Sequence, residues 1–285
     1  MTKKTTNPEG LRDRTLSHFA ALGIPVNAEA FDALLERTEK EGLSPLEFLD
    51  LALGEQAAER RRRSFERRIR EARFAETKTL EGFDWEFNKK AIHRAQIEEL
   101  ATGDFIRRRA NLILVGHSGV GKSHIIQALG VRACALGYRV VYRTSAQLIS
   151  DLTASLADKT LPERLRRYSR PDFFILDEFG FDRVERLECP EAAHLLYKVI
   201  AARNQQRSTA LVTNVDFDKW GEYLSDGPLA MAFLDRLVEN AIIIKIKGDS
   251  YRAQARKRDV SASKPSPTRE PDTKQASSCD RAQPH

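Results

Sequence analysis

Cysteine is scarce in this sequence, and long apolar runs are missing. Its three cysteines (Cys134, Cys189 and Cys279) are isolated and form no Cys-x-x-Cys pair, which argues against a disulfide framework and a cysteine-based zinc site. No run reaches the roughly 18 apolar residues of a membrane span. The opening residues, MTKKTTNPEGLRDR, contain no apolar signal segment. We therefore expect a cytoplasmic protein, kept reduced and without a membrane partner.

Positive charge is concentrated in one short segment. Residues 60–74 (RRRRSFERRIREARF) hold eight arginines and two glutamates, a net charge of +6 that equals the net charge of the whole chain. The remaining residues therefore sum to neutral. Such a segment is typical either of a solvated helix face or of a surface that meets a polyanion such as nucleic acid.

The pattern of apolar residues divides the chain into three parts. Residues 1–78 show helical periodicity and no strand signal, and Ser44 with Glu47 forms a capping-box pattern that predicts a helix start. Residues 79–252 alternate strands with helices. Residues 253–285 contain four prolines and no aromatic residue, so they cannot bury enough apolar surface to offset their chain entropy, and we expect a disordered tail.

Five apolar strands are predicted in the middle part: Asn111–Val115, Tyr138–Thr144, Asp172–Glu178, Ser208–Asn214 and Ile242–Lys247. Helical segments separate each strand from the next. This alternation predicts an α/β fold with a parallel sheet covered by helices on both faces.

The first strand leads into GHSGVGKS, which matches the phosphate-binding pattern G-x-x-x-x-G-K-[ST] in the required strand–loop–helix context. Its glycines allow a tight turn whose amide groups point at phosphate oxygens. Lys122 would contact the β- and γ-phosphates, and the Ser123 hydroxyl would bind Mg²⁺. The predicted nucleotide-binding residues are Gly116, His117, Ser118, Gly119, Val120, Gly121, Lys122, Ser123 and His124.

Polar residues end two later strands. Asp177 in DFFILDEF is the expected Mg²⁺ residue, and Glu178 is positioned to polarise an attacking water. Asn214 ends STALVTN and would orient that water. Asparagine also ends many strands simply as a turn former, and acidic residues end strands without a catalytic role.

Four stretches together resemble the AAA+ ATPases of the IstB type: NLILVGHSGVGKSHIIQALG, FFILDEFGF, STALVTN and LAMAFLDRLVENAIIIKIKGDSYR. These are helper proteins of bacterial insertion sequences, similar to DnaC helicase loaders and more distantly to DnaA initiators. The resemblance covers residues 79–252 and not the tail. His117 stands where the family often has proline, at a position that contributes backbone.

The resemblance implies a P-loop AAA+ core with strand order 5-1-4-3-2 and a small, basic, helical N-terminal domain that binds DNA or assembles. It also implies a homo-oligomer with ATP at protomer interfaces. Arg236 is the candidate arginine finger for a neighbour's γ-phosphate, or else a surface arginine paired with Asp235 or Glu239. Arg252 is a weaker candidate for a second phosphate sensor, and Phe83 either lines an adenine pocket or is a core aromatic.

The arginine-rich segment sorts into two sides if it is helical. Four arginines fall within a stripe of about 80°: Arg60, Arg63, Arg67 and Arg70. Phe65, Ile69 and Ala72 fall on the other side. Phosphate contacts would stabilise such a stripe, and binding would be largely independent of base sequence because no reading element is identifiable.

The sequence thus predicts an ATP- and Mg²⁺-dependent AAA+ regulator of DNA transposition in the bacterial cytoplasm. It would assemble on duplex DNA and recruit or activate the transposase of the same element, with ATP hydrolysis as the assembly switch. The alternatives are a DnaC-like helicase loader, a P-loop phosphotransferase acting on a small metabolite, and a nucleotide-gated DNA-binding module that does not hydrolyse ATP.

Overall fold

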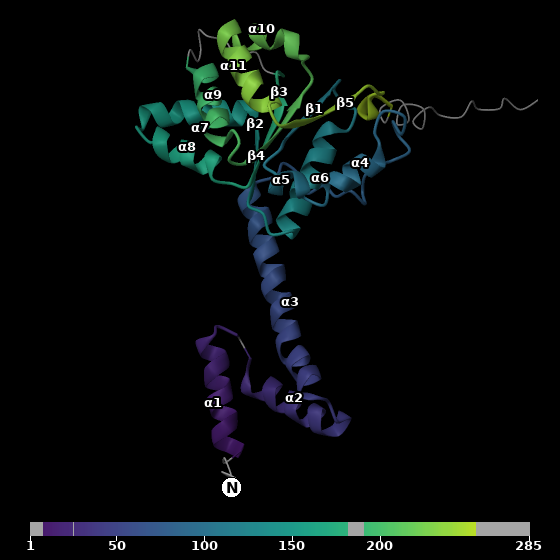
Figure 1. Ribbon diagram of the computed structural model, residues 1–285, viewed down its shortest axis with the longest axis vertical. Helices are drawn as coiled ribbons and strands as arrows, with labels where there is room; N and C mark the ends of the chain where they lie inside the picture. Colours follow the sequence, from purple (N-terminus) through teal and green to yellow (C-terminus); the bar gives the residue numbers. More distant parts are fainter. Residues whose placement is uncertain (1–7, 25, 182–190, 255–285) are drawn as a thin grey trace, which may run out of the picture.

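The computed structural model describes residues 8–24, 26–181 and 191–254, and these form a helical stem and an α/β core (Figure 1). The helices are α1 Pro8–Ala21, α2 Ala28–Glu41, α3 Pro45–Ala72, α4 Arg94–Leu100, α5 Asp104–Arg107, α6 Lys122–Ala135, α7 Ser145–Ala157, α8 Leu161–Ser169, α9 Ala192–Arg203, α10 Trp220–Leu224 and α11 Gly227–Val238, with a 3₁₀ turn at Phe217–Lys219. The strands are β1 Asn111–Gly116, β2 Val140–Thr144, β3 Phe173–Phe179, β4 Ser208–Thr213 and β5 Ala241–Ile246. Of the expected disordered tail, residues 253–285, the first two residues are helical and residues 255–285 lie outside the described residues. Cys189 and Cys279 also lie outside them.

The sheet has the predicted topology. All five strands run parallel in the order β2-β3-β4-β1-β5, the predicted order read from the other edge. Alternate residues of β1 face opposite layers: Leu112 and Leu114 pack with α6, whereas Ile113 and Val115 pack with α7, α9 and α11. Both faces of the sheet are therefore buried by helices, which explains why its central strands read as continuous apolar runs.

The stem consists of helices α1 to α3, and these three meet around one aromatic residue. Phe31 of α2 is buried, and its ring contacts Phe19 and Phe48 edge-on, with centroids 5.8 and 6.5 Å apart. The capping box is confirmed, because Ser44 Oγ accepts from the Glu47 amide at 3.3 Å and Glu47 Oε2 accepts from the Ser44 amide at 2.8 Å. This box starts α3, the long helix that joins the stem to the core (Figure 1).

The last turns of α3 pack on the core with the side that the sequence predicts. Phe65 and Ile69 are half-buried against the core cluster, and Ala72 is fully buried. Just beyond the helix, Phe74 leaves no room for a side chain at Gly130, since a Cβ there would lie 2.6 Å from its ring. The end of α3 is therefore held firmly against α6. The domain division at residue 78 stays a prediction.

Within the described residues, no helix is long and apolar enough to cross a membrane.

Candidate nucleotide site

The phosphate-binding loop joins β1 to α6 as predicted. Gly119 and Gly121 have φ values of +84° and +102°, a region that side chains disfavour. The ammonium group of Lys122 donates to the carbonyl oxygens of Gly116 at 2.7 Å and His117 at 2.8 Å. Burial lowers the pKa of Lys122, while Asp177 acts in the opposite direction and Arg252 adds to the lowering. The loop thus holds a buried cation at its centre.

Asp177 lies beside Ser123, so the two predicted metal residues meet. Ser123 Oγ donates to Asp177 Oδ1 at 3.2 Å, and the amide of Glu178 donates to the same oxygen at 2.8 Å. Oδ2 accepts from the hydroxyl of Tyr142 at 2.9 Å. Burial raises the pKa of Tyr142, so this hydroxyl remains a donor. Tyr142 is not among the predicted site residues. In the sequence it is marked only by having a hydroxyl group on a predicted apolar strand.

A hydroxyl and a carboxylate in contact fit the ligand preferences of Mg²⁺, which takes one or two protein oxygens and completes its shell with phosphate and water. The described residues contain no group of three or more His, Cys, Asp and Glu side chains that would hold a metal by themselves. A cation here would therefore depend on the nucleotide for its remaining ligands.

A backbone irregularity aims Glu178 away from its neighbours. The regular pairing of β3 with β4 breaks between Leu176 and Phe179, and Glu178 has a φ of +58°, unusual for a residue with a side chain. Its side chain is exposed, whereas those of Asp177 and Phe179 are buried. Ser145 Oγ donates to the carbonyl oxygen of Glu178 at 3.0 Å. The bulge thus brings a carboxylate to the surface beside the Ser123–Asp177 pair.

Asn214 follows β4 at the same edge of the sheet. The preceding Thr213 pairs with Val115 of β1 and with Phe179 of β3, so Asn214 lies between the phosphate-binding loop and the Glu178 bulge. Its side chain is exposed. Thr213 Oγ1 accepts from the amide of Val215 at 3.0 Å, which fixes the turn after the strand.

The segment after β5 closes over the phosphate-binding loop. The amide of Tyr251 donates to the Gly119 carbonyl at 2.9 Å, and a Cβ on Gly119 would lie only 2.2 Å from Ser250 Oγ. Asn88 anchors this segment through two bonds, because its Nδ2 donates to the Asp249 carbonyl and its Oδ1 accepts from the Asp249 amide, both at 2.9 Å. We call residues 248–252 with Asn88 the clamp. It places Arg252 close enough to influence the pKa of Lys122.

The start of α6 is covered from the other side by residues 79–85. A Cβ on Gly121 would lie 3.1 Å from the ring of Phe83, and that ring contacts His124 edge-on at 5.1 Å. The His124 nitrogen Nε2 lies 2.9 Å from the carbonyl oxygen of Thr79. Phe83 is therefore next to the loop, and it also packs against the core cluster, so its placement is compatible with both readings.

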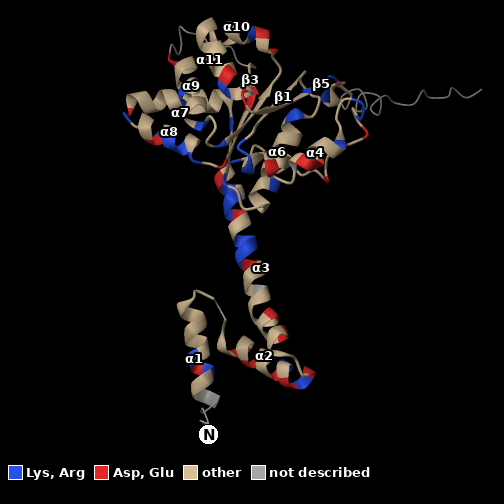
Figure 2. Cartoon of the chain, in the orientation of Figure 1, with Lys and Arg blue, Asp and Glu red and all other residues tan. Residues whose placement is uncertain are grey.

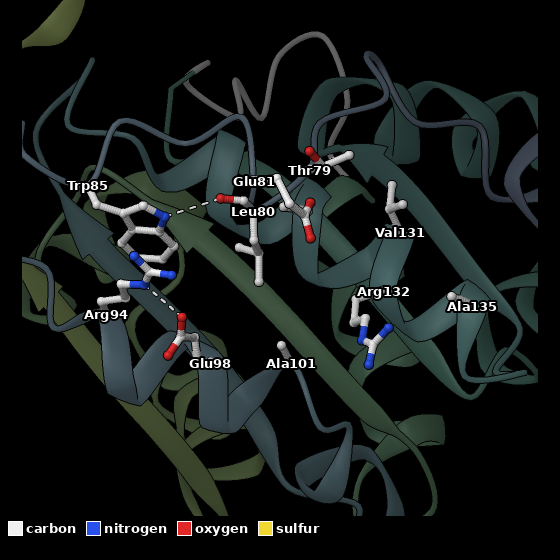
Figure 3. Close-up of a pocket in the computed structure, with 11 residues that line it drawn as sticks. Thr79, Leu80, Glu81, Trp85, Arg94, Glu98, Ala101, Val131, Arg132 and Ala135 are labelled. Carbon is white, nitrogen blue, oxygen red and sulfur yellow. Dashed lines mark hydrogen bonds and ion pairs between the residues drawn. The ribbon is translucent and has the colours of Figure 1, made fainter.

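A cavity of about 590 Å³ lies beyond this segment, along the later turns of α6 (Figure 3). Arg94 stacks over the ring of Trp85 at 5.3 Å and pairs with Glu98 at 2.7 Å. Ala128, Arg132 and other α6 residues line the opposite wall. Because these lie two to four turns after the phosphate-binding loop, the cavity is separate from the phosphate site.

Arg236 lies far from the other predicted catalytic residues. Its guanidinium group stacks over the Tyr197 ring at 5.2 Å and donates to the Ala232 carbonyl at 3.4 Å. Its carbonyl accepts from Asn111, the first residue of β1, so Arg236 is at the amino-terminal edge of the sheet and the loop is at the carboxyl-terminal edge. It is too far away to act on ATP bound to its own chain. Glu239, one expected ion-pair partner, instead accepts from Asn204 and Gln205.

The arginine stripe of α3 is exposed throughout: Arg60, Arg63, Arg67 and Arg70. Two of these four have acidic partners on the same helix, since Arg63 pairs with Glu59 at 2.5 Å and Arg67 with Glu71 at 3.9 Å. The stripe is therefore partly neutralised within the chain.

Residues 17–259 match the family of IstB-like ATP binding proteins. The chain belongs to this family. It is 37% identical over 227 residues to an ATP-binding protein of insertion sequence IS21 from Pseudomonas aeruginosa, covering 80% of this chain and 84% of the relative. It is 32% identical over 247 residues to the corresponding protein of IS5376 from Geobacillus stearothermophilus, covering 87% and 96%.

Among solved structures, AMPPCP-bound DnaA from Aquifex aeolicus superposes with a TM-score of 0.50 at 22% identity, covering 67% of this chain and 56% of that one. This similarity concerns the fold and confirms the P-loop AAA+ architecture of the IstB-like chain.

Proposed function

We propose that this IstB-like protein is an ATPase that regulates DNA transposition by assembling on duplex DNA in its ATP-bound form. The observation that carries the proposal is the contact of Ser123 with Asp177 beside the exposed Glu178, on the edge of the sheet where Lys122 lies. This is the arrangement that phosphoryl transfer to water requires: a cation for the phosphates, oxygen ligands for Mg²⁺ and a carboxylate for the nucleophile.

The chain's own residues divide the work. Lys122 exchanges its two carbonyl partners for phosphate oxygens, and the loop amides bind the same group. Ser123 and Asp177 would hold Mg²⁺, which supplies neutralisation of the phosphate charge. Glu178 takes a proton from water, and Asn214 orients that water from the next strand. Arg236 stabilises the γ-phosphate of a neighbouring protomer, since it is too far from its own.

The names of the relatives favour transposition over helicase loading, because they belong to insertion sequences. Duplex DNA and the transposase of the same element are accordingly the proposed partners. Co-purification with that transposase supports this assignment. Co-purification with a replicative helicase in its place supports the loader alternative.

The test compares ATP hydrolysis and assembly in wild type and two variants. We expect Glu178→Gln to bind ATP normally and to hydrolyse it about 10²–10⁴-fold more slowly, and to accumulate ATP-bound assemblies on DNA visible by electron microscopy. The control is Glu222→Gln, which neutralises an exposed glutamate on α10 and should behave as wild type. Equal hydrolysis by Glu178→Gln and wild type would remove Glu178 from the mechanism.

A further inference from the structure

A second basic site lies where α3 meets the core, outside the nucleotide site and the arginine stripe. A hollow of about 210 Å³ is lined by four arginines, one glutamate and a short apolar floor: Arg68, Glu71, Arg139, Val140, Val141, Arg167, Arg170 and Pro171. Figure 2 shows basic residues on the upper part of α3 and on α8. The lining comes from α3, the start of β2, and the end of α8 with the turn that follows it. We call this site the basic hollow.

The wall of the hollow formed by α8 and the turn after it is rigid. Arg203 is buried and donates to the carbonyl oxygens of Tyr168 at 2.8 Å, Ser169 at 3.2 Å and Pro171 at 2.9 Å. Arg139 in turn donates to the carbonyl of Arg170 at 3.2 Å. These bonds hold the backbone of residues 168–171 in place, so this wall of the hollow, which carries Arg170 and follows Arg167, is preformed.

The positive charge of the hollow is only partly compensated. Glu71 is shared with Arg67, and Asp172 pairs with Arg139 at 3.6 Å and with Arg207 at 2.7 Å. Within the part of the chain that the structure describes, the other lining arginines have no acidic partner: Arg68, Arg167 and Arg170. Three guanidinium groups around one hollow repel one another unless an anion lies between them.

The anion is not the ATP bound by the same chain. Val140 and Val141 begin β2, and Pro171 precedes β3, so the hollow is at the amino-terminal edge of the parallel sheet. The phosphate-binding loop is at the opposite edge. A strand of five residues spans about 16 Å at about 3.3 Å per residue, which separates the two sites.

The hollow adjoins the arginine stripe, which points to a polymeric anion. Glu71 lines the hollow and also contacts Arg67 of the stripe. From Arg60 to Arg70 the helix advances about 15 Å at about 1.5 Å per residue. Phosphates along one DNA strand are spaced about 3.4 Å apart along the helix axis, so stripe and hollow together face several successive phosphates. A single free phosphate would fill the hollow alone.

We infer that the basic hollow binds the phosphate backbone of duplex DNA, with Arg68, Arg167 and Arg170 as the contacting residues. This inference rests on the DNA binding of the proposed function and assigns it a site at the junction of α3 with the ATPase core. The hollow places DNA against the amino-terminal edge of the sheet, where Arg236 also lies.

The test measures binding of a 30-base-pair duplex over a range of salt concentrations, with and without ATP. The test variant is Arg68→Gln/Arg167→Gln/Arg170→Gln. The control, Lys159→Gln/Lys198→Gln/Lys219→Gln, removes the same net charge from exposed positions elsewhere on the core. We expect the test variant to bind more weakly and its plot of log affinity against log salt to be less steep by about three units, one per lost phosphate contact. The control should stay within about half a unit of wild type.

Each outcome separates the hollow from the proposed function. If the test variant and the control weaken salt-dependent DNA binding equally, the hollow is not the DNA site, although the proposal that the protein binds DNA still stands. A wild type that does not bind the duplex at all removes both. Binding of polyglutamate as tight as that of the duplex assigns the hollow to an acidic protein segment and overturns the inference. ATP binding and thermal unfolding show whether the triple variant is folded. If it is not, the measurement is repeated with the single variant Arg170→Glu. The native Arg170 side chain makes no hydrogen bond to the residues that the structure describes, so this replacement should not disturb the fold.

Discussion

The hydroxyl of Tyr142 donates a hydrogen bond of 2.9 Å to Oδ2 of Asp177, while Oδ1 of the same carboxylate accepts from Ser123. Tyr142 and Asp177 are both buried and come from neighbouring strands. The carboxylate expected to serve Mg²⁺ is therefore held in one orientation before any nucleotide binds. Preorganisation of this kind removes reorganisation from the chemical step.

Replacing Tyr142 with phenylalanine should raise the Mg²⁺ concentration needed for half-maximal ATP hydrolysis, because the Asp177 carboxylate loses its fixed orientation. Loss of a hydrogen bond to a charged group should also lower the free energy of unfolding by about 1.5–3 kcal/mol. The matched control is Tyr168→Phe, which deletes a similar bond to Asp151 at 2.6 Å outside the site. If both variants shift the Mg²⁺ requirement equally, Tyr142 acts only through stability.

The clamp should contribute to ATP affinity through Asn88. An Asn88→Ala variant loses both bonds to Asp249, so residues 248–252 are held less firmly on Gly119 and the loop is less ordered before binding. At about 1 kcal/mol for each of the two hydrogen bonds, we expect the Kd for ATP to rise by up to roughly 30-fold, measured by calorimetry. The control is Asn204→Ala, which removes a hydrogen bond from a side-chain amide to Glu239 away from the site and should leave the Kd unchanged. Unaltered affinity in Asn88→Ala would make the clamp irrelevant to nucleotide binding.

The strands and the phosphate-binding loop follow from local sequence, whereas the contacts that complete the site do not. Gly116 to Ser123 is a contiguous motif, and the apolar runs before it and at residues 172–178 specify their own strands. Asn88 and Asp249 lie 161 positions apart, and a side chain in a loop gives no sign of its partner. The bulge at Glu178 is equally hidden, since regular alternation predicts an ordinary strand.

Arg236 should act only between protomers. A Lys122→Ala chain lacks the phosphate-binding cation but retains Arg236, and an Arg236→Gln chain has the opposite defect. Each should be nearly inactive alone, since an arginine finger contributes about 10³–10⁵-fold to turnover. Mixing the two should restore part of the hydrolysis, because mixed interfaces combine an intact loop with an intact arginine. A mixture no more active than its components would leave Arg236 with only its structural contacts to Tyr197 and Ala232.

The pH dependence of stability should report the buried ammonium group of Lys122. Burial lowers its pKa in the folded, nucleotide-free protein below the ordinary value of 10.5, so between those two pKa values the unfolded chain binds more protons than the folded one. Stability therefore rises with pH across that interval. Subtracting the unfolding curve of Lys122→Met from that of wild type isolates this contribution. A flat difference would mean that Lys122 is solvated as an ordinary lysine.

Glu59 should restrain DNA binding by the stripe. It accepts hydrogen bonds from Arg62 at 2.8 Å and Arg63 at 2.5 Å, and these two lower its pKa to about 2, so it is charged at any working pH. Arg62 also pairs with Glu66 at 2.6 Å, so Glu59→Gln should mainly release Arg63 of the stripe, tighten duplex binding and steepen its salt dependence. Replacing the four stripe arginines with glutamine should do the opposite while sparing ATP binding.

The control for Glu59 is Glu36→Gln, which removes an acidic partner of Lys40 on α2 and should leave DNA affinity unchanged. If Glu59→Gln tightens DNA binding, the stripe variant weakens it and Glu36→Gln leaves it unchanged, the effect is due to phosphate contacts by these arginines. A general effect of net charge would make Glu36→Gln tighten binding as Glu59→Gln does. Equal effects of the two glutamate variants would return the stripe to a solvated helix face.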